Sequence, residues 1–296
     1  MTLHGEVAAT TRTDGVRFVF EVTNDGTAVE DIIFRDAGKA DFVVEPEQGD
    51  GAGRTAGVQI AGYRTGPDDP ALVLAAEGNV ERVPLESGTE LAYPLGGRRC
   101  AGLVDDGTHY PCDRPKAPYC DRHARDWAPS YADEEYAVYL AAFAPDSFKV
   151  GITRSWRLDT RLREQGADLA AHIHTVSSGP IARNVEREIA AGMPEAVRVD
   201  AKIDGLAAAV DREAWRALLD EYPPIETFAF DYGLSFADRP VAETVATGTV
   251  LGTKGRVLVL RRGGTVYATD LRALVGFAIA TETEADRDRQ TSLRAF

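Results

Sequence analysis

Short apolar or alternating runs recur at both ends of the chain and predict β-strands. Over residues 1 to about 95, such runs, among them VRFVFEV, AGVQIAGYR and ALVLAAE, are divided by clusters of Gly, Pro and Asp. Runs of this length between turn residues are typical of strands in a small sheet or barrel. Residues 225–296 return to this pattern, and KGRVLVLRRGGTVYATDL predicts a hairpin that turns at Gly263 and Gly264.

The middle of the chain alternates strand and helix periods. Residues 137–143 and 148–153 read as the two strands of a hairpin. The next segment predicts a helix that ends at Gly166 and packs inward through Trp156, Leu158 and Leu162. ADLAAHIHTV then predicts a third strand, and two imidazoles lie on one half-exposed face of it, those of His172 and His174.

Two further helices are expected before the chain returns to strands. Pro180 suits the first position of one helix, whose core stripe consists of Ile181, Val185 and Ile189. Asp211 is expected to cap the other, an amphipathic helix that packs through Trp215, Leu218 and Leu219. The predicted fold class is therefore α+β, with an α/β core between two β-rich flanks.

These patterns divide the chain into four segments. We expect a β-rich N-terminal domain at residues 1–96 and a cysteine-bearing loop at residues 97–130. An α/β domain follows at residues 131–222, and a β-rich C-terminal segment at residues 223–296 is able to pack with the N-terminal domain. The 296 residues exceed what one compact core usually organises. No run approaches the roughly eighteen apolar residues of a membrane span, and no secretory signal is visible. A cytoplasmic protein without membrane contact is expected.

The stretch CAGLVDDGTHYPCDRPKAPYCDRH contains all three cysteines of the chain. Cys100, Cys112, Cys120 and His123 offer three thiolates and one imidazole, a complete tetrahedral shell for zinc. Four protein ligands leave the ion no open position, so a structural zinc is predicted that supplies folding free energy to this loop. Disulfides are the alternative, but the odd number of cysteines argues against them. His109 could support or replace a ligand, although a solvated loop histidine is the simpler expectation.

The overall charge argues against wholesale nucleic-acid binding, because the net charge is -14 and the pI about 4.9. Only five of the 33 basic residues are lysines, against 47 Asp and Glu. This balance is typical of proteins that work in molar salt, where repulsion between carboxylates is screened, so a halophilic protein is predicted. Residues 98–125 and 149–189 depart from the acidic background, since each carries two more cations than carboxylates.

The α/β segment carries a resemblance to a known superfamily. AVY at 137–139 and KVGIT at 149–153 resemble, in sequence and separation, the two name-giving motifs of the GIY-YIG nucleases. The family pattern continues with an arginine on the next helix, matched by Arg161, and a glutamate on a later helix, matched by Glu186. Most of the chain also resembles a narrower uncharacterised prokaryotic and haloarchaeal family, domain of unknown function 2797, which brings no established activity with it.

The nuclease resemblance implies roles for individual residues. Tyr139 would serve as the general base that activates water, Arg161 would bind the phosphate, and Glu186 would hold a catalytic Mg or Mn ion. Arg157 and Lys149 would be auxiliary cations. Phosphodiester hydrolysis requires these functions. Lys149 replaces the tyrosine of the second motif, so one phenol is missing, although the lysine charge could lower the pKa of a nearby phenol or water.

Each of these residues also has a structural interpretation. Tyr139 could be a buried strand residue, Arg161 a solvated helix residue, and Glu186 the ion-pair partner of Arg183 or Arg187. The first hypothesis is a metal-dependent nuclease, or a nucleic-acid-processing protein derived from one, with a structural zinc. The alternatives are a zinc-containing module that binds nucleic acid or a nucleotide without cutting it, and a purely structural interaction protein.

Overall fold

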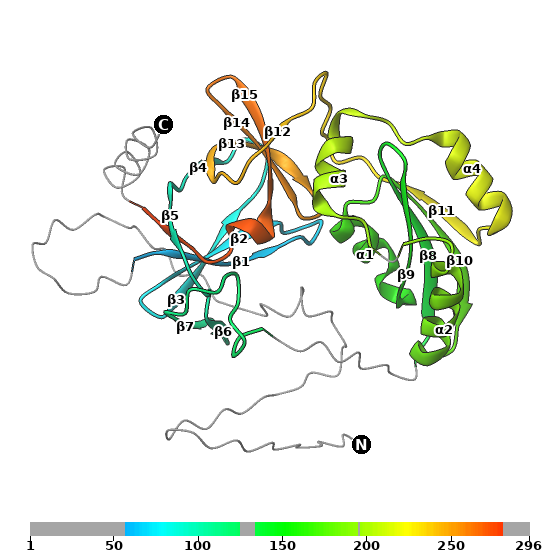
Figure 1. The fold of residues 1–296 in the computed structure, drawn as a ribbon, viewed down its shortest axis with the longest axis horizontal. Coiled ribbons are helices and arrows are strands. Elements are labelled where there is room, and N and C mark those ends of the chain that lie inside the picture. Colours follow the sequence, from blue (N-terminus) through cyan, green and yellow to red (C-terminus); the bar gives the residue numbers. More distant parts are fainter. Residues whose placement is uncertain (1–56, 125–133, 195, 281–296) are drawn as a thin grey trace, which may run out of the picture.

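The computed structural model describes residues 57–124, 134–194 and 196–280, which form three β-sheets with helices against them (Figure 1). The mixture of strands and helices confirms the predicted α+β class. The predicted run VRFVFEV and the C-terminal tail lie outside the described residues. Among the described helices, none is long and apolar enough to cross a membrane.

Strands from both ends of the described chain share two sheets. The larger sheet has the order β5-β16-β1-β2-β3-β7-β6 and consists of β1 (Gln59–Arg64), β2 (Ala71–Ala76), β3 (Asn79–Pro84), β5 (Leu95–Arg98), β6 (Leu103–Asp105), β7 (Thr108–Tyr110) and β16 (Phe277–Ile279). The other has the order β12-β15-β14-β13-β4 and consists of β4 (Glu90–Ala92), β12 (Val241–Ala242), β13 (Thr247–Lys254), β14 (Val257–Arg262) and β15 (Thr265–Asp270). We call these two sheets the β unit.

The β unit has one shared core, because β16 pairs with β1 and β5 while β4 pairs with β13. The short helix α5 (Leu271–Leu274) closes it, and the buried cluster includes Ile60, Leu72, Leu258, Leu260 and Leu271. The predicted hairpin is confirmed: β14 and β15 meet at Gly263 and Gly264, whose φ angles of 54° and 83° are those that a tight hairpin turn requires.

The third sheet forms the α/β unit and has the antiparallel order β11-β10-β8-β9. Its strands are β8 (Tyr136–Phe143), β9 (Ser147–Arg154), β10 (Leu169–Val176) and β11 (Glu226–Ala229). Its helical elements are η1 (Ser155–Arg157), α1 (Leu158–Gln165), α2 (Gly179–Ala190), α3 (Val199–Asp204), η2 (Gly205–Ala207) and α4 (Arg212–Glu221). The predicted hairpin, third strand and helices are thereby confirmed, including the cap at Asp211, whose carboxylate accepts from the backbone of Glu213 and Ala214.

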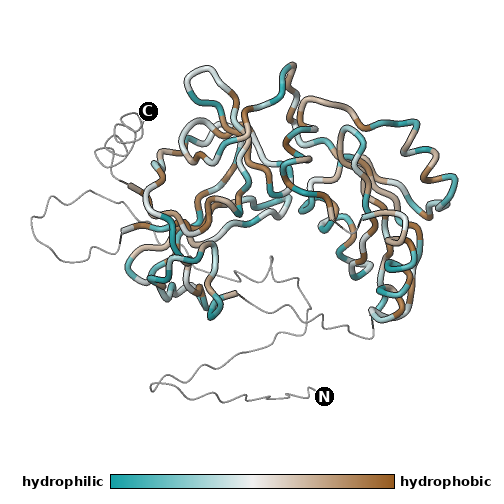
Figure 2. Tube along the Cα trace, viewed as in Figure 1, coloured by the Kyte–Doolittle hydropathy of each residue, from teal (hydrophilic) through white to brown (hydrophobic). Residues whose placement is uncertain are grey.

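The helices α1 and α2 cover opposite faces of this sheet. Side chains alternate along β8, and Val138 and Leu140 pack with residues of α2, whereas Ala137 and Tyr139 pack with α1. The Trp215 side chain of α4 joins the α2 face. Figure 1 shows α1 and α3 between this sheet and the β unit, and Figure 2 shows the strands carrying most of the hydrophobic residues while the turns between them are hydrophilic.

Two predicted core residues are exposed. Trp156 has an exposed fraction of 66%, because it lies in the 3₁₀ turn η1 and the helical period begins only after it. Ile181 is 47% exposed. The other two residues of the predicted stripe face the core, since Ile189 is buried and Val185 packs against the same cluster. The position expected for Ile181 is taken by the buried Ala182.

The α/β unit and the β unit touch backbone to backbone at the end of α1. A Cβ on Gly166 would lie 2.8 Å from the carbonyl oxygen of Lys254, and one on Gly255 would lie 2.6 Å from that of Glu164. Beside this contact the buried Lys254 ammonium lies 2.6 Å from an Asp168 carboxylate oxygen. Only glycine permits so close an approach, so these residues fix where α1 meets the β unit.

Candidate metal centre and cationic recess

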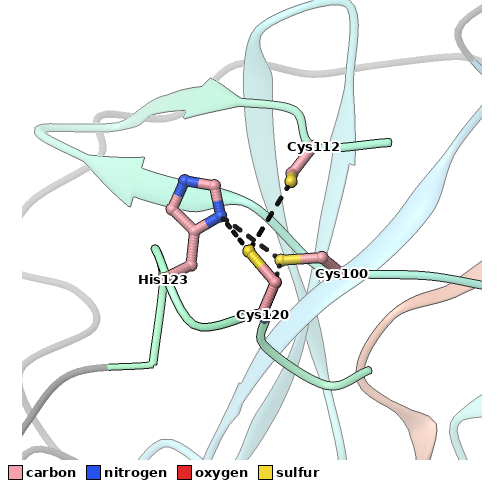
Figure 3. Close-up of side chains that lie close together, drawn as sticks. All are labelled: Cys100, Cys112, Cys120 and His123. Carbon is pink, nitrogen blue, oxygen red and sulfur yellow. Dashed lines mark hydrogen bonds between the residues drawn. The ribbon is translucent and has the colours of Figure 1, made fainter. Parts of the chain in front are cut away.

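Cys100, Cys112, Cys120 and His123 converge, as Figure 3 shows, from the loop between β5 and β8. All four ligand atoms lie within 4.8 Å of one another. The His123 Nδ1 atom is 3.3 Å from Cys100 Sγ and 3.4 Å from Cys120 Sγ, and the Cys112 and Cys120 sulfurs are 3.9 Å apart. The predicted cluster is therefore confirmed as a possible metal site.

The donor set and its spacing fit zinc. Zinc–sulfur bonds of about 2.3 Å and zinc–nitrogen bonds of about 2.0 Å in a tetrahedron place two sulfurs about 3.8 Å apart and a sulfur and a nitrogen about 3.5 Å apart. The observed separations match both values. Three thiolates and one imidazole would fill the four positions of the ion, which is the arrangement of a structural site.

Backbone groups already orient one of the sulfurs. The amides of Gly102 and Cys120 donate to Cys100 Sγ at 3.5 Å and 3.2 Å, and such contacts fix a metal ligand in place. Burial, together with hydrogen bonds to the other two thiols, raises the pKa of the Cys100 thiol to about 11. A metal ion must therefore displace this proton to bind the sulfur as a thiolate.

His109 differs from the simpler expectation, because it is buried rather than solvated. Its Nε2 donates to the carbonyl oxygen of Ala101 at 2.8 Å, and Ala101 directly follows the ligand Cys100. Burial lowers the pKa of His109. His109 lies in β7, which pairs with β6. Its hydrogen bond to Ala101 therefore fixes the backbone next to the ligand Cys100.

Tyr139 lies inside the sheet with an exposed fraction of 1%. Its hydroxyl accepts a hydrogen bond of 2.6 Å from Gln165 Nε2, and its ring covers Gly151, where a Cβ would come within 2.5 Å of the hydroxyl. Lys149 stands on the same strand as Gly151 and points to the same face, because the two residues are two positions apart. The glycine of the second motif thus makes room for the tyrosine of the first.

Arg157 and Arg161 both contact the carboxylate of Glu164. Glu164 accepts from Arg157 at 3.1 Å and 3.4 Å and lies 3.7 Å from Arg161. Arg157 is buried, whereas Arg161 is half-buried. The side chains of Arg157 in η1 and Arg161 in α1 therefore both contact Glu164, and Arg161 is the more exposed of the two.

Glu186 lies on α2, and therefore on the face of the sheet opposite to Tyr139 and Arg161. It is 4% exposed and forms an ion pair with Arg183 one turn earlier. The structure therefore brings Tyr139, Lys149, Arg157 and Arg161 to one face but leaves Glu186 on the other. The catalytic roles of all five stay predictions.

The rings of His172 and His174 were expected on one face of the third strand, β10. The strand register shifts between them, which breaks the alternation that would place both rings on one face. The His172 Nε2 atom lies 2.9 Å from the backbone oxygen of His174 and 3.0 Å from the Thr175 hydroxyl. Its ring is thus engaged with the strand itself.

A recess of about 90 Å³ lies where α1 meets the β unit. Three cations from separate segments line it: Arg161 of α1, Lys202 of α3 and Arg256, which precedes β14. The remaining lining residues are Tyr63, Thr65, Glu164, Gln165, Val197 and Val199. We call this the cationic recess.

Sequence reasoning missed Lys202, Arg256 and the surface position of Trp156. Lys202 and Arg256 stand far from Arg161 in the chain, and no local pattern predicts that α3 and the β13–β14 turn meet α1. The rarity of lysine was the one available signal, because the chain has only five. Two of them, Lys202 and Lys254, lie at this junction.

Comparison with known proteins gives one match. The model of a family described as a protein of unknown function (DUF2797) matches residues 113–236, a segment that takes in Cys120, His123 and the α/β unit through β11. No curated protein and no solved structure matches the chain. The match supports a relationship to an uncharacterised family, and the resemblance to GIY-YIG nucleases stays a prediction.

Proposed function

We propose that this protein binds nucleic acid without cleaving it, as a module whose cysteine loop is held by a structural zinc ion. The observation that carries the proposal is the surface around the start of α1. Trp156 exposes 66% of its area there, next to the arginine-bearing helix, and its ring lies 5.9 Å from the guanidinium of Arg157. An exposed aromatic ring beside cations is the combination with which proteins bind single strands.

The acidic composition does not oppose this function at the α1 surface. Base stacking on an aromatic ring does not depend on net charge and tolerates salt, whereas contacts to phosphate weaken as salt is added. In molar salt, Trp156 would therefore supply the persistent part of the binding free energy. Arg161 would add a contact to the phosphate backbone.

The geometry favours binding over hydrolysis. A general base must reach the attacking water, but the Tyr139 hydroxyl is buried and bonded to Gln165. A catalytic metal must bind the same phosphate that the arginine contacts, but Glu186 lies behind the sheet from Arg161. A nuclease is the second candidate, because Arg161 on α1 and Glu186 on α2 follow the hairpin of the two motifs, in the order that the superfamily resemblance implies.

The test measures binding and cleavage on the same purified, zinc-loaded chain. Fluorescence anisotropy with single-stranded and duplex DNA and RNA, from low salt to molar KCl, should show binding to single strands. Replacing Trp156 with alanine should weaken it by about tenfold or more, since stacking on one ring is commonly worth about 1–3 kcal/mol. Ile181→Ala is the matched control, because Ile181 is also an exposed apolar helix residue but lies on α2.

Cleavage is followed in parallel with Mg or Mn. We expect none from the wild type on any of these substrates. Metal-dependent cutting that disappears in Glu186→Ala and Arg161→Ala, and persists in the control Arg187→Ala, would establish the nuclease instead. Absence of binding to every nucleic acid by a folded, zinc-loaded chain would contradict both functions.

A further inference from the structure

We propose that the cationic recess binds a phosphate monoester, the group at a phosphorylated end of a nucleic acid, and that the β unit contributes to this site through Arg256. The inference rests on the proposed nucleic-acid binding and names the part of the ligand that this protein recognises. It also gives the β unit a role in binding.

The recess gathers positive charge from three segments that only the tertiary structure brings together. Arg161, Lys202 and Arg256 come from α1, α3 and the start of β14. The three-dimensional meeting of these elements is fixed by the contact between Gly166 and Gly255. Cations held in place before the ligand arrives bind an anion with little loss of side-chain entropy.

Hydrogen bonds and ion pairs hold the three cations at the recess. Lys202 Nζ donates to the backbone oxygen of Gln165 at 2.8 Å, and Arg256 pairs with Asp270 at 2.8 Å and 3.3 Å through two of its nitrogens. Arg161 lies 3.7 Å from Glu164, the one carboxylate that lines the recess. Arg157 also donates to Glu164, and the lining therefore carries three cations against one carboxylate.

The size of the recess selects the ligand. Its volume of about 90 Å³ holds a phosphate group, but it lies well below the roughly 300–1,000 Å³ of sites that enclose a nucleotide-sized molecule. A monoester presents three free oxygens, carries nearly two negative charges at neutral pH and needs a single exit for the rest of the chain. An internal phosphodiester carries one charge and needs two exits.

One polar atom of the recess lacks a partner within the described structure. Gln165 lines the recess, and its Oε1 is buried and accepts no hydrogen bond there, while its Nε2 donates to Tyr139. A buried acceptor without a partner is uncommon in a complete site. A ligand hydroxyl or a water bound with the phosphate would satisfy it.

The test compares oligonucleotides that differ only at their ends. Fluorescence anisotropy on the zinc-loaded full chain would use one single-stranded sequence with a hydroxyl or a phosphate at its 5′ end, and separately at its 3′ end. We expect one phosphorylated end to tighten binding by about tenfold or more, as charged hydrogen bonds commonly do. Arg256→Gln and Lys202→Met should each remove most of that difference and leave the affinity for the hydroxyl end unchanged.

Arg262→Gln is the matched control, since Arg262 is an exposed arginine at the far end of β14. Thermal unfolding of each variant checks that Arg256→Gln has not loosened the junction, and Lys202→Met leaves the Arg256 pair with Asp270 intact. Equal affinity for all four ends would overturn the inference while the proposed function stands. Loss of all binding in the wild type would overturn both.

Inorganic phosphate and a nucleoside monophosphate serve as competitors that separate the sources of the monoester. We expect inorganic phosphate and the nucleoside monophosphate to compete only weakly with the phosphorylated oligonucleotide, which binds more tightly. A mononucleotide that binds the recess as tightly as the oligonucleotide, with the same dependence on Arg256, would keep the recess as a monoester site. That result would show that the ligand of the recess is a free nucleotide, and it would contradict recognition of the end of a nucleic acid.

Discussion

Replacing Cys120 with serine tests the metal centre most directly. The Cys120 sulfur lies 3.4 Å from His123 Nδ1 and 3.9 Å from Cys112 Sγ, and its side chain is buried. The variant replaces one of the four ligands with a hydroxyl, which is not among the usual ligands of zinc. We expect the metal content to fall from about one zinc per chain to near zero at limiting zinc.

The size of the effect follows from the loop that the ion closes. Zinc would join Cys100 to Cys120 and so close a loop of about 20 residues, which the chain-entropy model of a cross-link values at about 3 kcal/mol. Besides the ion, backbone hydrogen bonds from Cys100 to Arg114 and from Ala101 to Pro118 hold the loop, and β7 pairs with β3 through Asn79 and Thr108. Ala101 and Tyr119 are the residues of the loop that pack in the core of the β unit, and the rest of that core lies outside the loop, so the loss should be mainly local.

Limited proteolysis with trypsin reads out that local loss, alongside metal analysis by mass spectrometry. The exposed Lys116 and Arg122 lie within the loop, and we expect cleavage at both to accelerate by about 100-fold when about 3 kcal/mol of protection is removed. Chelation of the wild type should reproduce the result. His172→Gln is the control that should keep its zinc and its rate of proteolysis, because His172 lies on β10 of the α/β unit. A Cys120→Ser variant with full zinc content and unchanged proteolysis would refute the assignment of the ligands.

Two further expectations concern stability. Tyr139→Phe should lower the free energy of unfolding by about 1–3 kcal/mol, because Gln165 Nε2 loses its acceptor, and should leave the affinity for oligonucleotides unchanged. Urea denaturation measures the stability, and fluorescence anisotropy measures the affinity. Weaker binding at unchanged stability would contradict a purely structural role of Tyr139. Burial lowers the pKa of His109 in the folded chain. As the pH falls below about 6.5, the imidazole is therefore protonated in the unfolded chain before it is protonated in the folded chain. Up to about 1.4 kcal/mol of stability is lost per pH unit until the pKa of the folded chain is reached. The difference in unfolding free energy between wild type and His109→Gln should therefore change between about pH 7 and pH 5, and a constant difference would oppose this reasoning.

The sequence alone determined the features that depend on neighbouring residues. The four metal ligands lie within one loop, so their spacing was sufficient to predict that they meet. Gly166 ends α1 with a φ of 71°, as a C-terminal glycine should, and Asp211 caps α4 through its own first turn. These contacts span few residues, and residue type and spacing therefore specify them.

The tertiary structure decided everything that depends on distant segments. A strand pattern predicts that β16 exists, but it does not predict that β16 inserts between β1 and β5. Many strands have the same alternation of side chains, so the alternation does not specify which strands pair. The period of α2 is equally satisfied by Ile181 or Ala182 facing the sheet, and close packing selected Ala182. The cationic recess has the same origin: Arg161, Lys202 and Arg256 meet only because two glycines let the backbones of two units touch, and such a contact leaves no local pattern in the chain.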